Sequence, residues 1–179
     1  MIFDASRRVK RRMDAAQGYL MLDLPDRALC ELDEIIDTDK ATCEYHLLRG
    51  EALRAKSDHR AALEAFHKAL EARPEDLGAL MGLAWCFKRI DRVDQSIETM
   101  QRAYESHQEI PVVLYNLACY YSLAGEKELA LSWLGRALRM DRGFTKLVPK
   151  ETDFDPLRDD PDFRHLIELT AKYTPRGGN

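Results

Sequence analysis

Apolar residues recur along most of the chain at the three- and four-residue spacing that places them on one face of an α-helix. The pattern stops at short segments rich in polar and turn-forming residues, and it then resumes with the same spacing. These segments read DLPD, SDHR, DRVD and AGEK, and they fall at or next to positions 23, 57, 91 and 125. The pattern therefore predicts an all-α chain in which pairs of helices form hairpins around these turns.

The hairpins repeat with a fixed period of 34 residues. Residues that lie 34 positions apart form a column, and the residues of a column are similar in size from one copy to the next. No insertion interrupts the period. Two columns hold small residues and two hold large ones: Ala16, Gly50, Ala84 and Ala118; Ala28, Ala62, Ser96 and Ala130; Tyr19, Leu53, Phe87 and Tyr121; and Leu32, Phe66, Met100 and Leu134. Helices approach closely only where the side chains at their crossing are small, and the large residues fill the space beside it. The period therefore indicates stacked repeats that bury their apolar faces against one another.

In this register the sequence resembles the tetratricopeptide repeat family. Units of that family pair a small residue and an aromatic residue in the first helix with Ala, an aromatic residue, Ala and often Pro in the second. Residues 43–76 match this pattern best, at Gly50, Leu53, Ala62, Phe66, Ala69 and Pro74. The other units depart from it where Pro is usual, at Lys40, Gln108 and Arg142. The resemblance implies a right-handed superhelical solenoid of tandem helical hairpins, with four repeats and a C-terminal capping helix.

We expect the chain to divide along these repeats. The expected segments are an extension of the first helix at 1–8, repeats at 9–42, 43–76, 77–110 and 111–144, a capping segment at 145–173 and a flexible tail at 174–179. In the capping segment, Asp155-Pro156 and Asp160-Pro161 each suit an N-cap followed by the first residue of a helix. Because the last helix carries its apolar residues on one side, we expect it to cover the open face of the fourth repeat.

Composition limits the classes of partner. The chain has 45% hydrophobic residues, 32% charged residues and a net charge of -4, which gives it no overall positive field. We therefore expect no nucleic-acid partner and no membrane partner. One local basic cluster could touch either, although a solvated first helix is the preferred interpretation: Arg7, Arg8, Lys10, Arg11 and Arg12. Cysteines without a CxxC pair, and the lack of a signal sequence or a long apolar run, indicate reduced thiols in a cytoplasmic protein.

The sequence predicts no enzymatic site. No P-loop, GxGxxG, GxSxG or HExxH motif occurs. The titratable residues are dispersed along a repeat pattern that helix packing already explains. Cys43 and His46 have a CxxH spacing, but no second close pair completes a zinc site. The acidic run at 153–162 lacks the Gly and the Glu that a calcium-binding loop needs, so helix capping is preferred. We expect no catalysis, no metal and no cofactor.

The resemblance places binding residues in the concave groove of the solenoid, which the first helix of each hairpin lines. Two rows and one neighbouring group of side chains are expected there: Met13, Leu47, Met81 and Tyr115; Gln17, Glu51, Trp85 and Cys119; and Arg54, Lys88 and Arg89. Packing between repeats is an equal alternative for Met13, Leu47 and Met81. Trp85 and Tyr115 are the preferred anchors, because an exposed aromatic pair suits a binding pocket.

One subclass of the family clamps the terminal carboxylate of heat-shock chaperones with Lys, Asn and Arg side chains. The corresponding positions here hold Met13, Gln17, Leu48, Gly78 and Gly82, so this partner is not expected. The prediction is a non-catalytic protein-protein interaction module or scaffold that binds a peptide segment of a partner protein, acidic with an apolar anchor, as a chaperone or assembly factor. The alternative is a structural protein that self-associates into a homo-oligomer.

Overall fold

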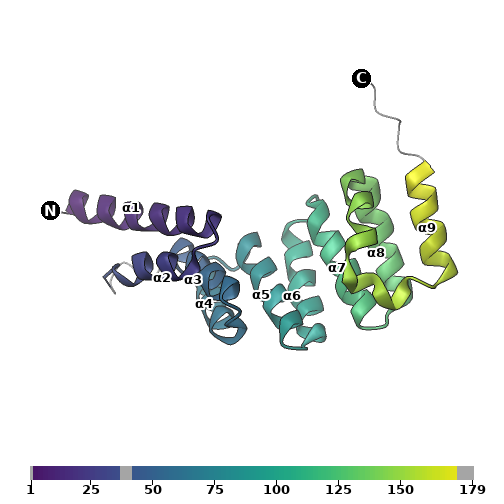
Figure 1. The fold of residues 1–179 in the computed structure, drawn as a ribbon, viewed down its shortest axis with the longest axis horizontal. Helices are drawn as coiled ribbons and strands as arrows, with labels where there is room; N and C mark the ends of the chain where they lie inside the picture. The colour runs from purple at the N-terminus through teal and green to yellow at the C-terminus, as the bar shows by residue number, and fades with distance from the viewer. Residues whose placement is uncertain (1, 37–41, 173–179) are drawn as a thin grey trace, which may run out of the picture. The chain divides into compact units, whose positions relative to one another are not determined.

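A computed structural model describes residues 2–36 and 42–172 of the chain (Figure 1). Every regular element in these ranges is helical and no strand occurs in them, so the all-α prediction is confirmed. The chain divides into two compact units, Met1–Arg92 (unit 1) and Val93–Asn179 (unit 2). The predicted tail at 174–179 lies outside the described residues, and the repeat boundaries stay predictions.

Helical hairpins build both units. Unit 1 contains α1 (Ile2–Met21), α2 (Pro25–Asp33), α3 (Cys43–Ala55), α4 (His59–Ala72) and α5 (Leu77–Arg89). Unit 2 contains α6 (Val93–Ser106), α7 (Pro111–Leu123), α8 (Lys127–Met140), the 3-10 helices η2 (Arg142–Lys146), η3 (Val148–Lys150) and η4 (Thr152–Leu157), and α9 (Pro161–Lys172). In unit 1, α1 packs on α2, α3 packs on α4, and α5 packs on both α3 and α4; in unit 2, α7 packs on both α6 and α8.

The 34-residue period of the sequence is also a period of backbone geometry. A residue in the left-handed conformation follows the first helix of every predicted hairpin: φ is 56° at Asp23, 62° at Ser57, 65° at Asp91 and 78° at Gly125. The next backbone N–H donates each time to a carbonyl five residues earlier, as Asp58 does to Leu53 at 3.0 Å. This hydrogen bond ends a helix in a Schellman motif, and the left-handed residue that it requires is most often Gly.

Replacing Gly125 by alanine is therefore expected to lower the free energy of unfolding by about 1–2 kcal/mol. A Cβ atom at Gly125 would meet no atom within 4 Å, so the loss would measure backbone strain alone. Urea denaturation followed by far-UV circular dichroism gives the value. Gly18 is the matched control, because a Cβ atom there also meets nothing within 4 Å but Gly18 lies inside α1. Gly18→Ala should stabilise by about 0.5–1 kcal/mol, and equal effects of the two substitutions would contradict the assignment.

One aromatic ring fills the centre of unit 1. Phe66 of α4 is fully buried, and Gly50 of α3 and Gly82 of α5 both face it. A Cβ atom would lie 2.6 Å from the ring at Gly50 and 2.4 Å from it at Gly82, and neither distance is sterically possible without a shift. The close approach of three helices to this ring is the physical reason for a small residue at Gly50.

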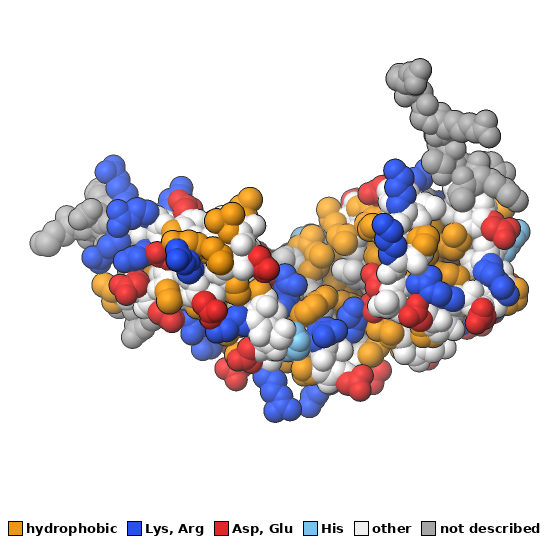
Figure 2. Space-filling view, viewed as in Figure 1, with side chains coloured by type: hydrophobic (Ala, Val, Ile, Leu, Met, Phe, Trp, Pro, Cys, Tyr) orange, Lys and Arg blue, Asp and Glu red, His pale blue; other side chains and the backbone are white. Residues whose placement is uncertain are grey.

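The basic side chains of α1 point either into solvent or toward the neighbouring helix α2. Figure 2 shows Lys and Arg side chains gathered around the N-terminal part of this helix, where Arg7, Arg8, Lys10 and Arg11 are exposed. Arg12 differs from them, because its guanidinium donates to Glu31 of α2 at 2.5 Å. The basic cluster therefore forms a solvated face of a helix whose opposite face is packed.

The C-terminal segment of unit 2 folds back over α7 and α8. Phe154 of η4 is fully buried and meets the Tyr115 ring of α7 edge to face, with centroids 5.7 Å apart. Helix α9 begins at Pro161 as predicted, with the Asp160 carboxylate accepting from the backbone N–H of Phe163 at 3.2 Å, and it packs on α8. The capping helix is therefore confirmed. No helix begins at Pro156, which lies inside the 3-10 helix η4 instead.

Candidate peptide-binding surface

Most of the predicted groove residues lie on two neighbouring helices of unit 1. Helices α3 and α5 pack together, and a Cβ atom at Gly78 would lie 3.4 Å from the Leu47 side chain. Side chains on these helices form the surface that we call the α3–α5 surface: Leu47, Glu51 and Arg54 on α3, and Met81, Trp85, Lys88 and Arg89 on α5. Arg89 is exposed and the other six are half-buried, so all of them are accessible in unit 1.

Trp85 is held in place by cationic and aromatic neighbours. The guanidinium of Arg54 lies over its ring at 5.0 Å from the centroid, and that of Arg89 lies at 5.6 Å. The His59 ring of α4 meets it edge to face at 5.3 Å. Cation–π contacts at exposed sites contribute about 0.5–1 kcal/mol each, enough to favour one orientation of the indole. The ring is therefore preorganised while part of it stays open to a ligand.

The α3–α5 surface carries more positive than negative charge. Arg54, Lys88 and Arg89 are opposed within the surface by the Glu51 carboxylate alone. Arg54 donates to Glu51 through Nε at 3.0 Å and through Nη2, and their side chains are 35% and 30% exposed. A partly exposed pair of this kind contributes little to stability, but it fixes the Arg54 guanidinium against the Trp85 ring.

Nothing in this surface is arranged for nucleophilic chemistry. Cys86 lies beneath it and is fully buried. Burial raises the pKa of the Cys86 thiol to about 11, and the nearby Arg54 charge offsets only part of that rise. The thiol is therefore neutral at physiological pH, whereas a reactive cysteine needs a lowered pKa.

The two predicted groove residues on α1 differ in burial. Met13 is 8% exposed and packs in a core cluster with Leu32 and Tyr45, so it is a packing residue and not a groove residue. Gln17 is exposed on the same helix. The sequence pattern left packing and binding as equal alternatives for Met13, and burial decides for packing.

Tyr115 and Cys119 are buried in unit 2, which corrects the prediction of an exposed aromatic anchor at Tyr115. Tyr115 is 5% exposed and stacks on Phe144 of η2, with centroids 4.6 Å apart and planes 17° apart. Cys119 is 2% exposed. Burial raises the pKa of Tyr115, and its hydroxyl has no hydrogen-bond partner among the described residues. The physical reason is that the chain continues beyond the fourth predicted repeat and lays η2 to η4 over α7.

Two features of these surfaces have no counterpart in the repeat pattern of the sequence. His59, which contacts Trp85, sits at the start of a second helix, where no repeated pattern singles it out. In unit 2, Arg136 lies 4.3 Å from the Trp133 ring centroid and 5.1 Å from that of Tyr104, on the second helices of their predicted hairpins. The mixture of Trp, Tyr and Arg could have indicated this cluster, but the resemblance directed attention to the first helices.

Within 2–36 and 42–172, no group of three or more His, Cys, Asp or Glu side chains could hold a metal ion. No helix of this described part combines the length and the apolar character needed to cross a bilayer.

Comparisons with known proteins identify the repeats. Two tetratricopeptide repeat models match residues 47–111 and 112–144, which together make up more than half of the chain. Tetratricopeptide repeat protein 8 of Caenorhabditis elegans is 26% identical over 125 residues. That alignment covers 70% of this chain but only 24% of the relative, so the chain spans about a quarter of that protein's length.

Solved structures show the same fold at low sequence identity. PilF of Pseudomonas aeruginosa has a TM-score of 0.74 and 18% identity, over 98% of this chain and 79% of its own. MamA of Desulfovibrio magneticus RS-1 has a TM-score of 0.70 and 18% identity, over 93% and 97%. YrrB, described as a TPR protein with an unusual peptide-binding site, has a TM-score of 0.71 and 16% identity, over 92% and 86%. The fold is that of a protein-interaction module, and the chain belongs to the tetratricopeptide repeat family.

Proposed function

We propose that the chain is a non-catalytic interaction module that binds a short segment of a partner protein on the α3–α5 surface. The observation that carries this proposal is Trp85, a half-buried indole framed by the Arg54 and Arg89 guanidiniums. Tryptophan and arginine are enriched among the residues that dominate binding energies at protein interfaces. The peptide-binding site named in the description of YrrB, a protein of the same fold, supports the same type of ligand.

The charges of this surface favour an acidic segment with one apolar anchor residue. An apolar side chain would cover the open part of the Trp85 ring, beside Leu47 and Met81, and remove it from water. Acidic residues on either side of the anchor would lie near Lys88 and Arg89. Complementary rim charges mainly accelerate association and select partners. Holding such a segment would suit a chaperone or an assembly factor.

Trp85→Ala is expected to weaken binding of this segment about 30-fold, which corresponds to the loss of an anchor contact of about 2 kcal/mol. The probe is an acidic peptide selected against the full chain from a random display library and labelled with a fluorophore. Fluorescence anisotropy measures its affinity. Lys88→Ala should weaken binding mainly at low salt, because screening shortens the reach of an exposed charge.

Trp133→Ala is the matched control, since Trp133 lies on α8 in unit 2. It should leave the affinity unchanged, and Trp85→Ala should leave the far-UV circular dichroism spectrum unchanged. Selected peptides that bind equally well to the Trp85→Ala variant would refute the proposed surface. A mass that grows with concentration in light scattering, and that falls in the same variant, would instead identify a second copy of the chain as the occupant.

A further inference from the structure

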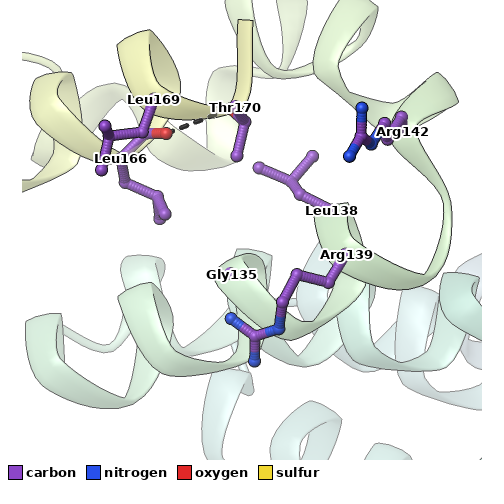
Figure 3. A pocket seen from close by; sticks show the side chains of 7 residues that line it. All are labelled: Gly135, Leu138, Arg139, Arg142, Leu166, Leu169 and Thr170. Carbon is purple, nitrogen blue, oxygen red and sulfur yellow. Dashed lines mark hydrogen bonds between the residues drawn. The ribbon is translucent and has the colours of Figure 1, made fainter. Parts of the chain in front are cut away.

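A separate cavity lies in unit 2, between the C-terminal part of α8, the start of η2 and α9 (Figure 3). Its volume is about 330 Å³, at the lower end of the range for sites that bind small molecules. None of its lining residues belongs to the α3–α5 surface. Any ligand of this cavity would therefore be additional to the proposed peptide segment.

The α9 side of the cavity is apolar. Leu166 and Leu169 line it from α9, and Leu138 lines it from α8 (Figure 3). Leu169 is 40% exposed, so an apolar ligand would remove part of its side chain from water. Gly135 keeps the α8 side open, because even a Cβ atom there would already contact Leu166 at 3.6 Å. These walls favour a hydrocarbon chain over a sugar or a free phosphate.

Two arginines also line the cavity. Arg139 near the end of α8 and Arg142 at the start of η2 both line it, and no lining residue is acidic. This positive charge is local, because the chain as a whole carries a net charge of -4. Arg139 forms no ion pair with any described residue. A guanidinium presents a planar set of N–H donors that matches the two oxygens of a carboxylate.

We propose that this cavity binds a carboxylate attached to a short alkyl chain, which is the chemistry of a fatty acid of about eight carbon atoms. The carboxylate pairs with Arg139 and Arg142, and the alkyl chain lies along Leu166 and Leu169. A peptide fits less well, because its backbone N–H groups would need acceptors inside the cavity. The Arg139 and Arg142 guanidiniums can only donate, so the Thr170 hydroxyl is the one side-chain acceptor among the lining residues.

Isothermal titration calorimetry of the full chain with octanoate, octan-1-ol and octylammonium tests this proposal. Octanoate should bind about tenfold more tightly than octan-1-ol, because only octanoate offers an anionic pair of oxygens to the guanidiniums, and octylammonium should not bind. Arg139→Gln and Arg142→Gln should each weaken octanoate binding about five- to tenfold and leave octan-1-ol binding unchanged. Arg102→Gln, at an exposed position of α6, is the matched control and should change neither affinity.

A second pair of variants locates the ligand. Gly135→Leu places a side chain in the cavity and should abolish octanoate binding, while Leu169→Gln should weaken octanoate and octan-1-ol alike. Thermal melting of each variant verifies that it is folded. If Gly135→Leu does not fold, Leu169→Gln still tests where the ligand binds. The proposal is overturned if octanoate does not bind, if octan-1-ol binds as tightly, or if Arg102→Gln weakens binding as much as Arg139→Gln. Peptide binding at the α3–α5 surface should be unchanged in all these variants, so the two proposals can fail independently.

Discussion

Replacing Phe66 by alanine is expected to lower the free energy of unfolding by about 3–5 kcal/mol, the usual range for a large aromatic side chain deleted from a core. The ring is fully buried and lies directly against Gly50 and Gly82. Helix backbones are rigid, so α3 and α5 cannot move independently to fill the cavity that the ring would leave. Urea denaturation measures the loss, and hydrogen exchange should show it as faster exchange within α3, α4 and α5.

The same contact predicts that the effect of a second substitution on stability depends on whether the Phe66 ring is present. In the wild-type chain, Gly82→Ala should destabilise by about 1–3 kcal/mol, because the new Cβ atom would overlap the Phe66 ring. In the Phe66→Ala background it should be neutral or stabilising, because the ring is gone and alanine is the better helix former. A double-mutant cycle isolates this coupling. Additive effects of the two substitutions would show that the ring and α5 do not meet as closely as the structure indicates.

The helical hairpins could be predicted from the sequence because their determinants are local. Each turn needs a left-handed residue after the first helix, and Asp23, Ser57, Asp91 and Gly125 recur at one step along the chain. The large column that begins at Tyr19 supplies the carbonyl groups that accept the closing hydrogen bonds of these turns, as Leu24 N–H shows at 2.9 Å. Residues whose conformation depends on nearby sequence recur in every repeat and can therefore be recognised from the period.

The role of Gly82 could not be predicted in this way. Gly82 falls outside the small columns, and the residue one period earlier is Leu48. The need for a glycine arises from one large ring at Phe66, whereas Leu32, Met100 and Leu134 occupy the same column in the other units. A column pattern records what successive copies share, so a contact made in one copy alone leaves no periodic signal.

The structure brings predicted surface residues together where the repeats are regular and buries them where the repeats end. The register assigned Glu51, Arg54 and Trp85 to one surface, and the structure brings them together on α3 and α5. The same register assigned Tyr115 to an open groove, although its ring is stacked against Phe144. Burial of Tyr115 depends on a segment that lies outside the period. The signal that could have revealed it was the presence of aromatic residues in an otherwise polar, proline-containing stretch.

Phe154→Ala is the corresponding test in unit 2 and should also lower the free energy of unfolding by about 3–5 kcal/mol. Phe154 is fully buried and contacts both Tyr115 of α7 and Phe163 of α9, each with ring centroids 5.7 Å apart. Its removal would leave a cavity beside the Tyr115 ring and loosen η4 from α7. Urea denaturation gives the loss, and hydrogen exchange should increase within α7 and α9 but not within α4.

Phe144→Ala provides the graded control for this prediction. Phe144 stacks on the same Tyr115 ring but is half-buried, so its removal should have a smaller effect than that of Phe154, because less apolar surface returns to water. If η2 to η4 are an integral part of the core of unit 2, the losses should rank in the order of burial. Two losses both below about 1 kcal/mol, the level of ordinary surface substitutions, would mean that the segment only rests on α7. Tyr115 would then be available to a partner of unit 2.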